Sequence, residues 1–246
     1  MNQGYDRAGG ASAGRTMARR FRPAAAALAA SALLLGCAAG APDRFYTLAE
    51  PGGAAAAGPG EPARQPGDPA PGSIAVGPVA VPEIVDRPQL VVLRGGQQVA
   101  VLESRRWAQS LPADIAARIA DELSRLLPGR RVYPDTDPAD RPPGRAVLRI
   151  ELRVERFETI TVTPPRIADD IAWTLRCAAA AAPAGGPDGY LRLRETAEPG
   201  GSDDIGALVA AHGRALAAAG RAIAASIAAR GSACLPDRPG DAAAVR

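Results

Sequence analysis

Hydrophobic and polar residues alternate over much of the central chain, a pattern that predicts a β-sheet. The longest such run covers residues 146–163, where apolar residues alternate with charged ones as far as Val154, as in a strand with one buried and one wet face. The apolar positions change phase at Phe157, which predicts a β-bulge near Glu155–Arg156. The Gly95-Gly96 pair predicts a hairpin. Shorter strands are expected at residues 45–48, 74–81, 90–93, 99–102, 131–134, 171–177 and 190–194.

Apolar residues recur at helical spacing in two further segments. In the first, Ser110 is the expected N-cap, Asp114 is the acid of the first turn, and Pro128 ends the helix. The second, residues 203–230, carries an apolar stripe that includes His212. Together these elements predict an α/β (α+β) fold: a single domain with a mixed β-sheet of about six to seven strands, packed with two main helices on one face.

The N-terminal region has the order of charges and apolar residues that secretory signals have. Arginines at positions 19, 20 and 22 precede an apolar run over residues 23–35, which is too short to span a bilayer as a permanent helix. The run ends in Leu34-Leu35-Gly36-Cys37, the lipobox pattern, whose cysteine thiol takes a diacylglycerol group. We therefore expect residues 1–36 to be a signal peptide and Cys37 to carry a covalent lipid. A twin-arginine export signal is the alternative, with a poorer match in the surrounding residues.

This signal divides the chain into parts. Met17 is the better start for such a signal, which would make residues 1–16 a mis-assigned start. Residues 37–72 then form the lipidated N-terminus, with a short strand and a flexible Gly/Pro/Ala-rich segment that has too little apolar surface to order itself. Ala38, in place of Asp, favours the outer membrane by the usual sorting rule. The remaining parts are a periplasmic α/β domain at 73–232 and a C-terminal tail at 233–246.

The charge of the chain is concentrated in the predicted signal peptide. Every one of the 29 basic residues is Arg, and the formal net charge is +3. Residues 1–36 hold five of these arginines and one acid, so the rest of the chain has 24 basic and 25 acidic residues. A mature protein so close to neutral does not indicate a nucleic-acid partner.

Residue types that carry catalysis or bind metals are scarce. His212 is the only histidine and lies in an apolar helical stripe, where a packed residue is expected rather than a catalytic one. With no HExxH, CxxC or GxSxG motif, the sequence offers no catalytic residue, no metal site and no cofactor beyond the lipid on Cys37. A secreted hydrolase is therefore disfavoured, because no pair of nucleophile and base stands out.

Cys177 and Cys234 are the two thiols that remain after lipidation of Cys37. In an oxidising periplasm, an even number of remaining thiols favours a disulfide, which would tie the C-terminal tail to the sheet. Two unpaired structural cysteines are the alternative.

The segment PEIVDRP, residues 82–88, is an expected rigid corner that begins and ends with proline. Charged residues there are poor core material, so either a partner or a local ion pair must account for them. The later ESRRW motif places an indole beside two guanidiniums, either as a contact surface or as a core tryptophan with solvated neighbours. The residues predicted to contact a partner are Glu83, Asp86, Arg87, Arg105, Arg106 and Trp107.

The segments IAVGPVAVPEIVDRPQLV and ESRRWAQSL resemble the PqiC/YmbA-like family, the auxiliary lipoproteins of ABC-type and MCE-type lipid transport systems. The resemblance spans residues 45–229 and is weakest at 134–201. It implies a non-enzymatic outer-membrane lipoprotein facing the periplasm of a Gram-negative bacterium, which docks the periplasmic MCE component of a membrane transporter complex. A stand-alone envelope scaffold that maintains membrane integrity without transport is the alternative, and self-association into a homo-oligomer stays open.

Overall fold

A computed structural model of the chain describes residues 42–50, 73–95, 97–136, 146–177, 186–197 and 204–230. The chain divides into two compact units, Met1–Pro42 and Asp43–Arg246, and all described helices and strands belong to the second. In chain order these elements are β1 (Arg44–Tyr46), β2 (Ser73–Ala80), β3 (Gln89–Leu93), β4 (Val99–Trp107), α2 (Leu111–Leu126), β5 (Val132–Pro134), β6 (Ala146–Ile160), β7 (Arg166–Cys177), β8 (Gly189–Thr196) and α3 (Asp204–Arg230).

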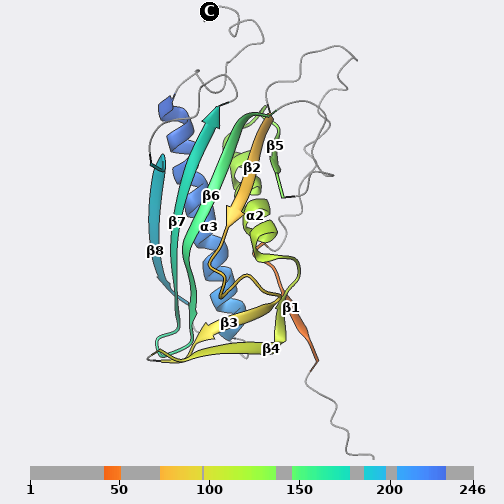
Figure 1. The fold of residues 1–246 in the computed structure, drawn as a ribbon, viewed down its shortest axis with the longest axis vertical. Coiled ribbons are helices and arrows are strands. Elements are labelled where there is room, and N and C mark those ends of the chain that lie inside the picture. The colour runs from red at the N-terminus through yellow and green to blue at the C-terminus, as the bar shows by residue number, and fades with distance from the viewer. Residues whose placement is uncertain are drawn as a thin grey trace, which may run out of the picture. The chain divides into compact units, whose positions relative to one another are not determined.

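The sheet is built around β6, which pairs with three other strands (Figure 1). β7 runs antiparallel along its whole length, with a register shift between Val154 and Arg156 that confirms the predicted bulge. The other side of β6 is shared by β2 and, near Ile160, by β3, both parallel to it. The mixed sheet has eight strands among the described residues, slightly more than the six to seven expected.

Both described helices lie on the same face of the sheet (Figure 1). The apolar side of β6, including Leu148 and Ile150, is fully buried beneath them. The α3 stripe is buried as predicted, from Ile205 through His212 to Ile227. The α/β fold with its helices on one face is therefore confirmed. No helix in the described ranges combines the length and apolar character needed to cross a membrane.

β2 continues through Gly77-Pro78, and its register on β6 shifts there, between Val76 and Val79. Gly77 has a φ of 134°, and a Cβ there would lie 2.7 Å from the backbone oxygen of Asp135. Because no other residue adopts this conformation easily, glycine is required where β2 passes the end of β5.

The predicted N-cap of α2 is in the right place but does not cap through its side chain. Ser110 has the extended backbone of an N-cap residue, and its hydroxyl makes no capping hydrogen bond. Its carbonyl oxygen accepts from the Asp114 N–H at 3.0 Å. The carboxylate of Asp114, the predicted acid of the first turn, points to the segment after β1.

Candidate functional site

The corner at residues 82–88 is a turn fixed by its backbone. Val85 N–H donates to the Pro82 oxygen at 3.0 Å, and Asp86 N–H donates to the Glu83 oxygen at 3.2 Å. Val85 is buried and joins the core, which holds the turn against the domain. The Pro88 oxygen accepts from the Trp107 N–H at 2.8 Å. A corner attached at these points presents its remaining side chains in a fixed arrangement.

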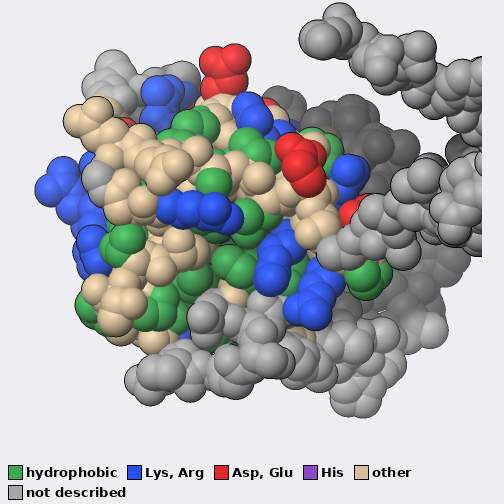
Figure 2. Space-filling model, turned by 90° about the horizontal axis from the view of Figure 1, so that it is seen from below, with side chains coloured by type: hydrophobic (Ala, Val, Ile, Leu, Met, Phe, Trp, Pro, Cys, Tyr) green, Lys and Arg blue, Asp and Glu red, His purple; other side chains and the backbone are tan. Residues whose placement is uncertain are grey.

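The charged side chains of this corner face solvent. Glu83, Asp86 and Arg87 are exposed, and their side chains make no hydrogen bond or ion pair among the described residues. The predicted alternative, in which Asp86 and Arg87 pair with each other, is therefore not seen. Figure 2, viewed from the end that carries β3 and β4, shows arginine side chains spread between hydrophobic ones over that end.

Trp107 belongs to the core rather than to a contact surface. Its side chain is 6% exposed and meets the Phe157 ring edge-on, with centroids 6.2 Å apart. Phe157 in turn stacks on His212 at 4.0 Å. The prediction that Trp107 contacts a partner is therefore corrected. The bulge in β6 that turns Phe157 inward is what gives the indole an aromatic neighbour.

Arg105 and Arg106 hold the first strand of the folded unit. β1 runs parallel to β4 and pairs Arg44 with Arg105 and Phe45 with Arg106. Arg105 Nη1 donates to the Tyr46 hydroxyl at 3.0 Å. Arg106 forms an ion pair with Asp43, at 3.7 Å between Nε and Oδ2. The six residues predicted as one contact surface thus separate into an exposed corner, a pair of arginines beside β1, and a core tryptophan.

Sequence reasoning missed the role of Asp114, which is buried at the start of α2. Its carboxylate accepts hydrogen bonds from Thr47 Oγ1 at 3.0 Å, from the Leu48 N–H at 2.9 Å and from Gln109 Nε2 at 2.8 Å. The Leu48 side chain is buried in the core. Asp114 and Leu48 therefore fix the segment after β1, although they lie 66 positions apart in the chain.

A second buried polar group surrounds the only histidine. His212 Nδ1 lies 2.9 Å from Asp169 Oδ2, and His212 Nε2 lies 3.0 Å from Thr159 Oγ1. The order carboxylate, imidazole, hydroxyl resembles a nucleophilic relay, but all three side chains are buried. Burial raises the pKa of the Asp169 carboxyl above its usual range. Because no substrate reaches these groups without opening the core, the group fits a structural role, as predicted for His212.

Of the three cysteines, Cys177 alone lies in the described part of the chain. Cys177, at the end of β7, is disulfide-bonded. Cys234 and Cys37 lie outside the described residues, together with the predicted signal peptide, so the Cys177–Cys234 pairing and the lipid on Cys37 stay predictions. Within the described ranges, no three His, Cys, Asp or Glu side chains are placed to hold a metal ion.

Comparisons with known proteins bear on both the family and the fold. The family model described as "ABC-type transport auxiliary lipoprotein component" matches residues 46–224. A crystal structure of an uncharacterized protein is similar at 17% identity and a TM-score of 0.51, over 76% of this chain and 99% of that one. The likeness to this structure concerns the fold alone.

Two further crystal structures are similar over less of the chain. Protein XCC0632 of the DUF330 family, from Xanthomonas campestris, is 16% identical with a TM-score of 0.47, over 64% of this chain and 86% of that one. A protein described as a lipoprotein, from Caulobacter crescentus CB15, is 20% identical with a TM-score of 0.32, over 46% of this chain and 79% of that one. No curated protein matches the chain.

Proposed function

Because the chain belongs to the family of ABC-type transport auxiliary lipoprotein components, we propose that it docks the periplasmic MCE component of such a system at the outer membrane. In this proposal Cys37 carries the lipid anchor, and the exposed corner at residues 82–88 forms part of the docking surface. The protein acts by binding and positioning its partner rather than by catalysis.

The observation that carries the docking proposal is the unpaired charge of the corner. Glu83, Asp86 and Arg87 are exposed without partners in the described part of the chain, on a turn that Val85 fixes to the core. A pre-ordered turn docks a partner without a large cost of ordering. Arginine is also among the side chains most often found at binding hot spots.

The corner is tested by single substitutions with a matched control. Arg87→Ala and Asp86→Ala are expected to weaken binding of the purified MCE component and to leave the melting temperature nearly unchanged, since neither side chain has a partner to lose among the described residues. Arg153→Ala is the control, because Arg153 is exposed on β6 and likewise has no partner among the described residues. A melting temperature that falls while binding persists would make the corner a structural brace.

The salt dependence of binding separates a charge-dominated docking surface from a largely apolar one. The chain after residue 36 is close to neutral, so apolar contacts are expected to supply much of the docking energy. Binding should then weaken only modestly with added salt, and a steep dependence would contradict this expectation.

The rival function is a stand-alone envelope scaffold that maintains membrane integrity without transport. The two differ in whether a transporter is needed. The scaffold function is favoured by two results together: loss of this protein causes the same envelope defect whether or not the MCE component is present, and the two proteins do not co-purify.

A further inference from the structure

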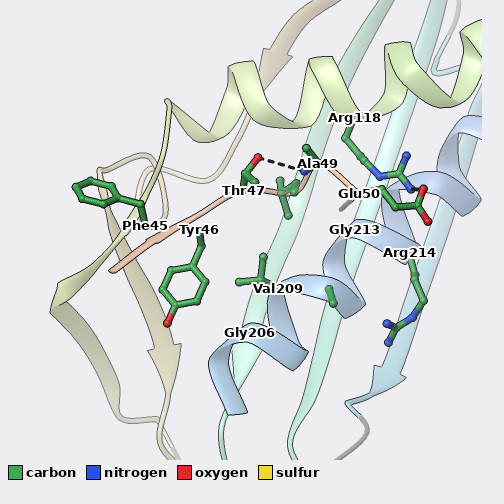
Figure 3. A pocket seen from close by; sticks show the side chains of 12 residues that line it. Phe45, Tyr46, Thr47, Ala49, Glu50, Arg118, Gly206, Val209, Gly213 and Arg214 are labelled. Atoms are coloured by element: carbon green, nitrogen blue, oxygen red, sulfur yellow. Dashed lines mark hydrogen bonds and ion pairs between the residues drawn. The ribbon is translucent and has the colours of Figure 1, made fainter. Parts of the chain in front are cut away.

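A groove of about 450 Å³ separates the segment after β1 from the first half of α3 (Figure 3). Its volume lies within the range of small-molecule sites, roughly 300–1,000 Å³. Figure 3 shows Tyr46 and Val209 facing each other across it, while Phe45 points away. Arg118 reaches toward Glu50 from α2. One wall of the groove is therefore apolar and one end is cationic.

Arg118 is the unusual residue of this groove. Its side chain is only 5% exposed, and it donates no hydrogen bond among the described residues. Its Nε and Nη1 atoms are buried without an acceptor. Buried donors that lack a hydrogen-bond partner are rare and costly in folded proteins. A guanidinium in this position has capacity for an oxyanion that the described part of the chain does not supply.

The carboxylates that surround Arg118 compensate its charge only loosely. Glu122 Oε2 lies 3.7 Å from Nη1, and Glu50 Oε2 lies 3.5 Å from Nη2. Glu122 is also bound by Arg125 and Arg221, which donate the hydrogen bonds that Arg118 does not. Glu50 is 57% exposed and lies at the open side of the groove. It also forms an ion pair with Arg125, which binds Glu122 as well. Of the two carboxylates, Glu50 is the one that a ligand can displace.

The second cation of the groove, Arg214, is already paired. Its Nε donates to Glu195 Oε1 at 2.6 Å, and its side chain is exposed. The charged residues that line the groove are thus Arg118, Arg214 and Glu50. The only poorly satisfied one is Arg118, at the end opposite the apolar pair Tyr46 and Val209.

We propose that this groove binds a single-chain anionic amphiphile, with a carboxylate or a phosphate monoester as its head group. The head group takes the place of the Glu50 carboxylate at Arg118 and accepts a hydrogen bond from Nη2, which Glu50 approaches only to 3.5 Å. The start of the hydrocarbon chain lies between Tyr46 and Val209. Glu50 acts as an internal competitor of the ligand.

The ligand is tested by calorimetric titration with three probes of equal chain length, below their micelle concentrations: dodecanoate, dodecyl phosphate and dodecanol. The protein is the chain from Ala38 to Arg246, which retains the whole compact unit Asp43–Arg246 and every contact described above. Either anion should bind more tightly than dodecanol by about tenfold or more, and the tighter of the two identifies the head group. Equal binding of dodecanol would overturn the proposal.

Substitutions locate the site without relying on Arg118, whose removal could disturb α2. Ala210→Trp should abolish anion binding, because Ala210 is exposed on α3 and lines the groove. Ala225→Trp is the matched control, exposed on the same helix outside the groove. Glu50→Gln should tighten binding by about two- to fivefold. Unchanged binding in Ala210→Trp, or weaker binding in Glu50→Gln, would overturn the proposal.

Discussion

Asp114→Ala is expected to release the segment that follows β1 while the rest of the sheet stays paired. The carboxylate accepts three hydrogen bonds, and one of them comes from the buried Leu48 N–H. Leaving that N–H without an acceptor costs about 1–3 kcal/mol. Thr47 and Gln109 are partly exposed and turn to water, at a net loss of about 0.5–1.5 kcal/mol each.

These terms together amount to about 2–6 kcal/mol against the docked segment, a shift of roughly thirtyfold or more in its opening equilibrium. Hydrogen exchange measures it directly. The amides of Leu48 and Ala108 are the reporters, because Leu48 N–H donates to Asp114 and Ala108 N–H donates to the Tyr46 oxygen at 2.8 Å. Both amides should exchange at least about tenfold faster in Asp114→Ala.

The control is Asp121→Ala, which removes an acid from the same helix that donates or accepts no hydrogen bond with the segment among the described residues. Amides that donate between β6 and β7 report the stability of the sheet. The reasoning is refuted if the amides of Leu48 and Ala108 keep their protection in Asp114→Ala. It is also refuted if the β6–β7 amides lose as much protection as those two amides.

Three further outcomes are expected. Cys37→Ala should leave an unprocessed or non-acylated protein, and an unmodified Cys37 in the wild type by mass spectrometry would refute the lipid anchor. Non-reducing peptide mapping of exported protein should find Cys177 linked to Cys234, a bond that stabilises by about 4 kcal/mol on the chain-entropy model; two free thiols would exclude it. A hydrogen bond from Arg194 lowers the pKa of Asp170. This hydrogen bond therefore stabilises the folded protein above the unfolded pKa of 3.8, and the stabilisation is lost as the pH falls through the lower folded pKa. In chemical denaturation, Asp170→Asn should be less stable than the wild type at higher pH, and this difference should shrink as the pH falls below 3.8.

The elements with strong periodic patterns were predictable from the sequence. The alternation that ends at Val154 and resumes at Phe157 predicted the long strand and its bulge, because successive side chains of a strand point to opposite faces of the sheet. The stripe of α3 and the hairpin at Gly95 followed from local patterns in the same way. These features depend on neighbours a few positions apart.

Contacts between distant residues were not predictable. Nothing in the residues around Asp114 marks it as an acceptor for Leu48, since an acid in a first helical turn is ordinary on its own. The contacts of His212 with Asp169 and Thr159 likewise join a helix to two strands of the sheet. Trp107 carried two interpretations, and only the position of Phe157 decided between them.

The attachment of β1 determines which parts of the domain bear a force that is applied to the N-terminal end. Tension applied ahead of Asp43 enters the domain through the short parallel pair of β1 with β4, and through Asp114 and Leu48 immediately behind it. Force from an anchor at Cys37 would reach β4 and α2 first, and β2 only after the segment at Leu48 had come away.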